Sequence, residues 1–394
     1  MSARKMHDVA IVGAGMVGAA LALKLARAGF DVVVIEPRVP APWSDQDDID
    51  LRVVALAPSS ARLFADLDIW SDLVAARACA YRRMHVWDAL APGELNFDAA
   101  EQGERALGWI VENRAIQHLL WQRLHNEANV TLRCPARVTA TDADENRRTL
   151  TLDDDTTLSA RLVVAADGAN SVLRDMLGIG THERDYAQRA IVAHVSTQRS
   201  HEFTAWQRFL PGSVLAFLPL VDGRSSIVWS LPVIEAARVL GLDDAQFCAA
   251  LGLAFDFRLG TVTGTTLRAA FPLRLRTADR YIALRFALIG DAAHVVHPLA
   301  GQGVNLGLRD AQELAATLVE SRDAKRNFAA ESTLREYERR RRSDNTLFAH
   351  AFDAIQRVFA SDALPLATLR GAGLTAVDRI GPLKRLFVAH AAGR

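Results

Sequence analysis

The amino-acid sequence predicts an α/β fold in which a parallel, Rossmann-like dinucleotide-binding sheet carries an inserted antiparallel sheet and is followed by C-terminal helices. Glycine-containing motifs end three apolar runs that lie far apart in the chain. Short β-rich runs fill the region between the second and third motifs, and helical patterns follow the third. Apolar runs that end in glycine turns are typical of buried parallel strands.

The composition sets the size and class of the protein. The chain has 394 residues, half of them hydrophobic, which is enough for two interleaved domains. Lys plus Arg and Asp plus Glu are both 46, so the formal net charge is zero. The charge therefore gives no indication of a nucleic-acid partner. The three cysteines are scattered without a CxxC pair, which predicts reduced thiols in a cytoplasmic protein.

The uncharged stretch Val9–Leu23 is predicted to be a buried strand, turn and helix rather than a signal peptide or membrane span. It is shorter than the ~20 apolar residues that a span needs, and it contains three regularly spaced glycines. No other segment is long and apolar enough to cross a bilayer.

The first motif is predicted to form a strand–helix–strand unit. Asp8–Val12 is an apolar strand, Gly13–Ala28 reads as a helix that Gly29 ends, and Asp31–Ile35 is a second, valine-rich strand. Glu36 follows that strand, 23 residues after Gly13. This is the arrangement of a dinucleotide-binding unit.

The chemistry of this unit follows from its residue types. Gly13, Gly15 and Gly18 have no Cβ, so the backbone at the helix N-terminus approaches a pyrophosphate closely. The carboxylate of Glu36 accepts hydrogen bonds from both ribose hydroxyls of an adenosine. A glycine-rich packing turn is the alternative, and NAD and FAD enzymes share the signature.

The chain between the first two motifs alternates helices and strands. After a polar loop over Pro37–Asp50, helices are expected over Arg52–Leu67 and over Glu112–Asn126, whose apolar residues share one face. Strands are expected at Met84–Trp87, Glu94–Phe97, Val130–Arg133 and Val138–Thr141, and a hairpin at Thr149–Leu152 with Thr157–Ala160.

The region from Ala190 to Ser230 predicts an antiparallel sheet that belongs to a different domain. Turn residues separate its β-rich runs, which are Ile191–Ser196, Thr204–Leu210, Val214–Leu220 and Ser226–Leu231. We therefore expect a discontinuous cofactor domain over 1–75, 106–180 and 281–345, a substrate-binding sheet domain over 76–105 and 181–280, and a C-terminal helical region over 346–394.

The second and third motifs each follow an apolar run. Asp167 and Gly168 come after Leu162–Ala165, and Gly290 and Asp291 come after Ala287–Ile289. Asp291 is placed to accept hydrogen bonds from the hydroxyls of a ribityl chain, and it is equally suited to cap a helix. Together the three motifs describe a site for a long, bent, phosphate-bearing cofactor, and FAD fits best.

A glycine turn over Pro298–Gly303 leads into a helix predicted over Val304–Ser321. Free backbone N–H groups at that helix N-terminus stabilise an anionic reduced flavin ring. His294 and His297 form an H-x-x-H pattern without a third ligand of matching spacing, so no metal site is predicted. These histidines are expected to pack or hydrogen-bond beside the cofactor, and His297 as a proton carrier is the alternative.

Three polar residues are candidates for the pyrophosphate and the ribityl chain. They are Arg52, Arg114 and Gln117, and the last two share a helix face because they are three residues apart. The alternative for each is a solvated surface side chain. No Gly-x-Ser-x-Gly and no Cys/His pairing indicates a nucleophile, as expected where a flavin supplies the reactive group.

With these residues in view, the chain resembles the class A FAD-dependent aromatic monooxygenases, and most closely the ubiquinone-biosynthesis hydroxylases. The resemblance covers essentially the whole length. Its most specific part is HPLAGQGVNLG, which belongs to the segment that contains the third glycine motif. The matching segments are GAGMVG at 13–18, LRVVAL at 51–56, MHVWDA at 84–89, VENRAIQ at 111–117, LVVAADGANSVLR at 162–174, FLPL at 217–220 and GDAAHVVHPLAGQGVNLGLRDA at 290–311.

The resemblance implies a glutathione-reductase-type flavoprotein with FAD at the boundary of two domains. It implies catalytic roles for His297 and Pro298. The cofactor-binding residues are then Gly13, Gly15, Gly18, Glu36, Arg52, Arg114, Gln117, Asp167, Gly290, Asp291, Pro298, Gly301, Gln302, Gly303, Val304 and Asn305.

The implied reaction uses O₂ and NAD(P)H. Reduced FAD forms a C4a-hydroperoxide that hydroxylates the ring of a polyprenyl phenol or benzoquinol of ubiquinone biosynthesis, and water must be excluded until transfer. The alternatives are a flavin hydroxylase of another aromatic compound, a flavin dehydrogenase or oxidase, and a non-catalytic flavoprotein that organises a biosynthetic complex.

The C-terminal stretch Leu364–Ala392 mixes apolar residues with four basic ones, Arg370, Arg379, Lys384 and Arg385. This composition suits contact with the inner face of the membrane or with other ubiquinone-biosynthesis proteins. Helices packed on their own domain are the alternative.

Overall fold

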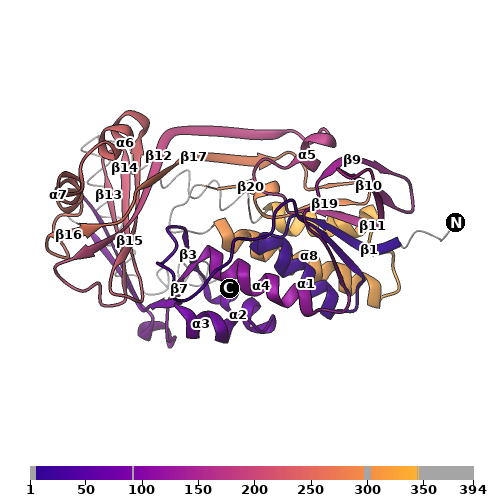
Figure 1. Ribbon diagram of the computed structural model, residues 1–394, viewed down its shortest axis with the longest axis horizontal. Coiled ribbons are helices and arrows are strands. Elements are labelled where there is room, and N and C mark those ends of the chain that lie inside the picture. The colour runs from indigo at the N-terminus through magenta and orange to yellow at the C-terminus, as the bar shows by residue number, and fades with distance from the viewer. Residues whose placement is uncertain (1–5, 91–92, 297–302, 344, 346–394) are drawn as a thin grey trace.

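The computed structural model describes residues 6–90, 93–296, 303–343 and 345. Within these ranges the chain forms a mixed α/β molecule with two large sheets and one small sheet, which confirms the predicted fold class (Figure 1). The predicted C-terminal region 346–394 lies outside the described residues, as do the site residues His297, Pro298, Gly301 and Gln302.

The first large sheet has eight strands and carries the three glycine-containing motifs. Its main path runs β18-β19-β11-β1-β2-β8, and β10 and β9 extend from β11. The pairs from β19 to β8 are parallel. The strands are β1 (Met6–Val12), β2 (Val32–Ile35), β8 (Val130–Arg133), β9 (Val138–Ala143), β10 (Arg148–Leu152), β11 (Thr157–Ala165), β18 (Ile282–Ala283) and β19 (Phe286–Leu288).

Three helices lie together on one face of this sheet (Figure 1). They are α1 (Met16–Arg27), α4 (Asn113–Asn126) and α8 (Gly303–Asp323). A further helix over 331–343 contacts the same core, where Leu334 and Tyr337 are fully buried. The apolar runs of β1, β2, β11 and β19 are almost entirely buried in that core, as expected for parallel strands covered by helices.

The second large sheet is antiparallel apart from the pair β13–β5, and it has nine strands. Its path runs β20-β17-β12-β15-β14-β13-β5-β6, with β16 paired to β12. The long strands β12 and β17 extend from this sheet toward the first one (Figure 1). The strands are β5 (Arg83–Asp88), β6 (Glu94–Asp98), β12 (Thr181–Thr197), β13 (Thr204–Leu210), β14 (Ser213–Pro219), β15 (Ser225–Pro232), β16 (Val262–Thr265), β17 (Ala269–Ala278) and β20 (His294–Val295).

Strand alternation gives this sheet two different faces. One face packs against α6 (Val233–Leu240) and α7 (Asp244–Ala254) through a buried apolar cluster. The other face borders the cavity described below. The predicted strands at 84–87 and 94–97 are confirmed as members of this sheet.

The prediction of a single helix over Arg52–Leu67 is wrong in its first half. The chain forms strand β3 (Val53–Leu56) and then helix α2 (Pro58–Asp66). The β-branched Val53 and Val54 pair with β7 (Gly108–Glu112), and Pro58 starts the helix where its missing N–H costs nothing. Strand β4 (Cys79–Tyr81) pairs with the other edge of β7 and completes the small sheet.

The remaining described elements are short. Helix α3 covers Trp70–Ala76, α5 covers Val172–Met176, and single 3₁₀ turns lie at Ala100–Gln102 and at Gly290–Ala292, labelled η1 and η2. Among the helices of the described ranges, none combines the length and the hydropathy needed to cross a membrane.

Candidate cofactor groove and adjoining cavity

The sheet places the three glycine-containing motifs next to one another. Val12, at the end of β1, is in register with Ala165 at the end of β11, and Ala165 is in register with Leu288 at the end of β19. On the other side Val12 pairs with Ile35, which precedes Glu36. Segments separated by more than 100 residues therefore present their turns at one sheet edge. The carboxyl edge of a parallel sheet is where α/β proteins bind nucleotides.

The first turn is built by two glycines whose positions leave no room for a side chain. Gly13 has φ of +103°, and a Cβ there would lie 2.3 Å from the carbonyl oxygen of Ala166. A Cβ on Gly18 would lie 2.1 Å from the carbonyl oxygen of Gly13. Gly15 is different, because a Cβ there meets no atom within 4 Å. The missing side chain at Gly15 thus leaves open space beside the N-terminus of α1.

That open space is part of a groove of about 470 Å³ between the first two motifs. Its residues include Gly13, Gly15, Glu36, Gln117 and Asp167. One carboxylate oxygen of Glu36 accepts a hydrogen bond from the backbone N–H of Ala14 at 2.7 Å. The carboxylate is thereby fixed at the mouth of the glycine turn, with lone pairs left for a ligand's hydroxyl groups.

The second turn is held from inside by Asp167 and Arg174. Asp167 Oδ2 accepts from the N–H of Val172 at 2.9 Å, and burial raises the pKa of this carboxyl. Arg174 is 4% exposed and donates to the carbonyl oxygens of Ala169 at 3.0 Å and Ala292 at 3.2 Å. One guanidinium therefore ties the second motif to the third, a role that the sequence analysis did not assign.

The third turn presents Asp291 to solvent. Its side chain is exposed, and desolvation by the surrounding protein atoms, together with the charge of Asp310, raises the pKa of its carboxyl. The Asp291 carboxylate accepts no hydrogen bond from the described residues. It remains available for the hydroxyl groups of a ligand.

Beneath Asp291, a buried polar cluster fixes the turn. Asp310, on the apolar face of α8, accepts from the N–H of Gly290 at 3.0 Å and lies 2.5 Å from His294 Nε2. Its other oxygen accepts from Arg341 Nε at 2.7 Å and from Asn345 Nδ2 at 3.2 Å. Burial alone would raise the pKa of Asp310, but the charges and hydrogen bonds of His294 and Arg341 outweigh burial and lower it to about 2.

The sequence held one signal for this cluster. Asp310 interrupts the buried face of α8 that contains Leu306, Ala311 and Leu314. A carboxylate on an apolar stripe needs a buried partner, and those partners lie 16 and 31 residues away in the chain. His294 was expected beside the cofactor, and the structure places it behind the third turn.

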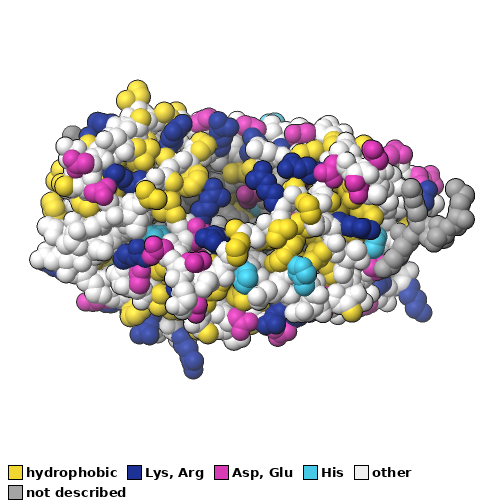
Figure 2. Space-filling view, in the orientation of Figure 1, with side chains coloured by type: hydrophobic (Ala, Val, Ile, Leu, Met, Phe, Trp, Pro, Cys, Tyr) yellow, Lys and Arg dark blue, Asp and Glu magenta, His cyan; other side chains and the backbone are white. Residues whose placement is uncertain are grey.

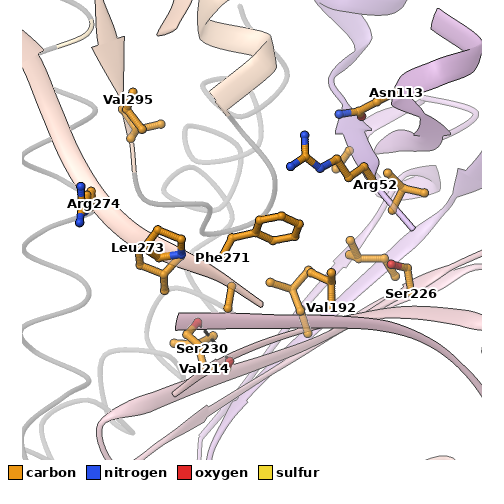
Figure 3. A pocket seen from close by; sticks show the side chains of 18 of the residues that line it. Arg52, Asn113, Val192, Val214, Ser226, Ser230, Phe271, Leu273, Arg274 and Val295 are labelled. Carbon is orange, nitrogen blue, oxygen red and sulfur yellow. Dashed lines mark hydrogen bonds between the residues drawn. The ribbon is translucent and has the colours of Figure 1, made fainter. Parts of the chain in front are cut away.

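A cavity of about 550 Å³ adjoins the groove on the side of the antiparallel sheet (Figure 3). The turn after β11 serves both recesses, because Gly168 lines the groove while Ala169 and Asn170 line the cavity. The cavity walls are mainly apolar, including Val192, Val228 and Phe271. In the space-filling view, a hollow flanked by basic side chains lies near the middle of the molecule (Figure 2).

The predicted polar trio separates in the structure. Gln117 lines the groove, whereas Arg114 donates to the carbonyl oxygen of Pro42 in the preceding loop. Arg52 extends into the cavity, where its guanidinium lies 4.7 Å from the ring centre of Phe271 (Figure 3).

Helix α8 starts at Gly303 and brings Val304 and Asn305 to the third motif. The side chain of Asn305 is fully buried and serves the start of α2. It accepts from the N–H of Ala57 at 2.9 Å and from Ser60 Oγ at 2.7 Å, and it donates to Ala55. The side chain of Asn305 therefore holds the start of α2 and is not directed at a cofactor.

The residues present fit a dinucleotide. The glycine turn lets a pyrophosphate approach the N-terminus of α1 without meeting a side chain. Glu36 suits a ribose, and Asp291, which accepts no hydrogen bond from the described residues, suits a polyol chain. The apolar cavity is lined by Ala169 and Asn170, which directly follow Gly168 of the groove. Fold and site together define an FAD-binding flavoprotein.

Comparison with known proteins agrees with this class. Residues 6–348 match the FAD binding domain family. The 3-demethoxyubiquinol 3-hydroxylase of Escherichia coli is 40% identical over 98% of both chains, and the ubiquinone hydroxylase UbiL of Rhodospirillum rubrum is 41% identical over 100% of this chain and 91% of its own. The crystal structure of Pseudomonas aeruginosa PqsL with 2-aminobenzoylacetate superposes with a TM-score of 0.79, at 25% identity, over 94% of this chain and 100% of its own.

The chain therefore belongs to the FAD-dependent aromatic monooxygenases, in the family of ubiquinone-biosynthesis hydroxylases. The family resemblance inferred from the sequence is confirmed, and so is FAD as the cofactor class.

Proposed function

We propose that this protein hydroxylates the aromatic ring of a polyprenyl phenol or benzoquinol intermediate of ubiquinone biosynthesis, using O₂ and NAD(P)H. The observation that carries the proposal is the junction of the two recesses at residues 168–170, which sets an apolar cavity beside a dinucleotide groove. The names of the two bacterial relatives supply the substrate class.

The residues on the sheet edge hold the cofactor in this proposal. The backbone at Gly13 and Gly15 receives the pyrophosphate, Glu36 the adenosine ribose and Asp291 the ribityl hydroxyls. When bound, FAD supplies the activation of O₂ with electrons from NAD(P)H. His297 and Pro298 remain sequence-based candidates for catalysis, outside the described residues.

The cavity contributes an apolar enclosure and positive charge. Its described lining includes Arg52, Arg274 and Arg276 and no acidic residue. Arg274 and Arg276 pair with Asp185 and Glu183, at 3.3 Å and 2.6 Å. The guanidinium of Arg52 forms no ion pair within the described ranges. Its uncompensated charge lowers the pKa of a phenol bound nearby, and a phenolate ring is the more reactive toward an electrophilic oxygen.

The test follows the oxygen atoms. FAD-loaded protein is given NADH or NADPH, ¹⁸O₂ and a prenylated phenol, and the product is analysed by mass spectrometry. One ¹⁸O atom is expected in the ring and the second in water. An oxidised product without label would overturn monooxygenation in favour of a dehydrogenase or oxidase. Equal conversion of an unprenylated phenol would favour the alternative of another aromatic substrate.

The position of the ring carbon is tested in cells. Bacterial strains that each lack one ubiquinone-pathway hydroxylase are complemented with this gene, and their quinones are identified. Restored ubiquinone in one strain identifies the position. Failure in every strain, with FAD-loaded protein present, would contradict the pathway assignment.

We also propose peripheral contact with the inner face of the membrane through the basic and apolar stretch Leu364–Ala392. Its composition supports the proposal, because basic residues attract anionic lipid while apolar residues insert at the interface. Flotation with anionic vesicles tests it: a chain ending at residue 363 is expected to lose binding while keeping FAD. Unchanged flotation of the shortened chain would refute this role.

A further inference from the structure

The wall of the cavity is one face of the antiparallel sheet. Because side chains alternate along a strand, every second residue of β12, β15, β14 and β13 faces the cavity. The paired residues Val192, Val228, Ala216 and Gln207 form one row across these strands. Their strand neighbours Ile191, Ile227, Phe217 and Trp206 belong to the cluster under α6 and α7.

Gln207 is the polar exception in this row. It lines the cavity and is 8% exposed, and its amide makes no hydrogen bond with any described residue. The adjacent residues Ala216 and Val86 on β14 and β5 are both apolar. The amide therefore keeps its donor and acceptor free for a molecule that occupies the cavity.

Two other polar side chains of this sheet form hydrogen bonds within the protein. Ser230 lines the cavity and donates to the carbonyl oxygen of Val214 at 3.4 Å. Gln188, on β12, donates to the carbonyl oxygen of Gly212 at 2.8 Å. Gln207 and Gln188 are the same residue type, but only the amide of Gln207 is left without a hydrogen bond to the described residues.

The location of Gln207 separates it from the cofactor turn. Arg276 of β17 contacts Asn170 at 3.2 Å, next to the turn that the groove and the cavity share. Strand β13 lies four strand spacings from β17 in the sheet. At about 4.8 Å per spacing, Gln207 is roughly 19 Å across the sheet from Ala269, its row partner on β17, and Arg276 lies seven residues further along that strand. The amide thus faces the part of the cavity that is remote from the cofactor groove.

We propose that Gln207 is a specificity-determining residue that hydrogen-bonds an oxygen substituent on the aromatic ring of the substrate. The inference rests on the proposed function and deepens it. A carboxamide both donates and accepts, so it pairs with a ring hydroxyl in either direction and donates to a methoxy oxygen. Among apolar neighbours, such a pair discriminates strongly against a ring that lacks the oxygen, because the amide is then left unpaired.

The test uses matched pairs of monoprenylated phenols that differ in one ring oxygen. One pair exchanges methoxy for ethyl and the other exchanges a second hydroxyl for methyl. Dissociation constants are measured on the FAD-loaded protein from the perturbation of flavin absorbance. The wild-type protein is expected to bind the oxygenated member of at least one pair about 10-fold or more tightly, the effect of one hydrogen bond of about 1.4 kcal/mol.

The variants Gln207→Met and Gln207→Leu remove the amide and keep similar bulk. Both variants are expected to bring the ratio of the two dissociation constants to about one, because they weaken binding of the oxygenated phenol. The affinity for FAD and the Tm are expected to stay unchanged. Gln122→Leu, at an exposed position of helix α4, is the matched control and is expected to keep the ratio of the two dissociation constants.

A ratio that survives in both Gln207 variants would overturn the proposal, and so would wild-type protein that binds both members of each pair equally. Reduced FAD affinity with an unchanged ratio would overturn it in favour of a purely structural role. FAD-loaded wild-type protein that neither binds nor converts any of the phenols would overturn the proposed function itself, and this assignment with it.

Discussion

Replacing Gly15 by valine tests the groove assignment because nothing inside the protein requires glycine there. Its φ of −64° and ψ of 179° are available to any residue, and an added Cβ meets no protein atom within 4 Å. At Gly13 and Gly18, by contrast, a Cβ would lie 2.3 Å and 2.1 Å from backbone oxygens. The bare surface at Gly15 therefore suits close approach of a bound molecule to the N-terminus of α1.

The expected magnitudes differ between folding and binding. Gly15→Val should change the free energy of unfolding of the FAD-free protein by no more than about 1 kcal/mol. It should also displace the pyrophosphate from the N–H groups of α1. Two charge-assisted hydrogen bonds of about 1.5–3 kcal/mol each are then lost. The dissociation constant for FAD rises by a factor on the order of 10²–10⁴.

The assay compares FAD-free proteins by urea unfolding and FAD affinity by flavin fluorescence titration. Gly15→Ala is the graded variant and should weaken FAD binding less than valine. Gly13→Ala is the contrast and should lower the free energy of unfolding by about 3 kcal/mol or more, through backbone strain and overlap with Ala166. If Gly15→Val binds FAD as tightly as the wild type, the groove assignment is refuted. If Gly15→Val loses as much unfolding free energy as Gly13→Ala, the conclusion that a side chain at position 15 meets no protein atom is refuted.

Two further substitutions test the third turn. Asp291→Ala should raise the dissociation constant for FAD about 10- to 100-fold without affecting folding, because the exposed carboxylate has no described protein partner; an unchanged flavin titration would contradict its role. Asp310→Asn should cost about 3–5 kcal/mol in urea unfolding at pH 7, since it breaks a buried ion pair with Arg341. The pKa of Asp310 is about 2 in the folded protein and about 3.9 in the unfolded chain. This difference stabilises the fold above pH 4, and the stabilisation is lost as pH falls toward 2. The free energy of unfolding of Asp310→Asn should therefore lack this part of the pH dependence. An acid limb identical to that of the wild type would contradict it.

Local patterns were sufficient for the strands and for the turns that end them. Short runs of Val, Ile, Leu and Ala that end at a glycine turn, or at a carboxylate followed by proline, favour buried strands, and β1, β2 and the second half of β11 agree with that expectation. The failure at 52–67 has a local cause. Val53 and Val54 fit a helical pattern as well as an extended one, and their partner strand β7 lies more than 50 residues away. Pro58 was the one local indication that the helix starts there.

The sequence by itself determined the cofactor class and the family, because glycine and carboxylate positions at strand ends are short-range features. Only the tertiary structure decided which side chains meet. It directs Arg52 into the cavity and Arg114 to a loop, and it joins Asp310 to His294 and Arg341. It also places Gln207 on the cavity wall, where no described residue hydrogen-bonds its amide. These outcomes depend on strand order and helix packing between segments that are distant in the chain, and residue spacing alone does not encode them.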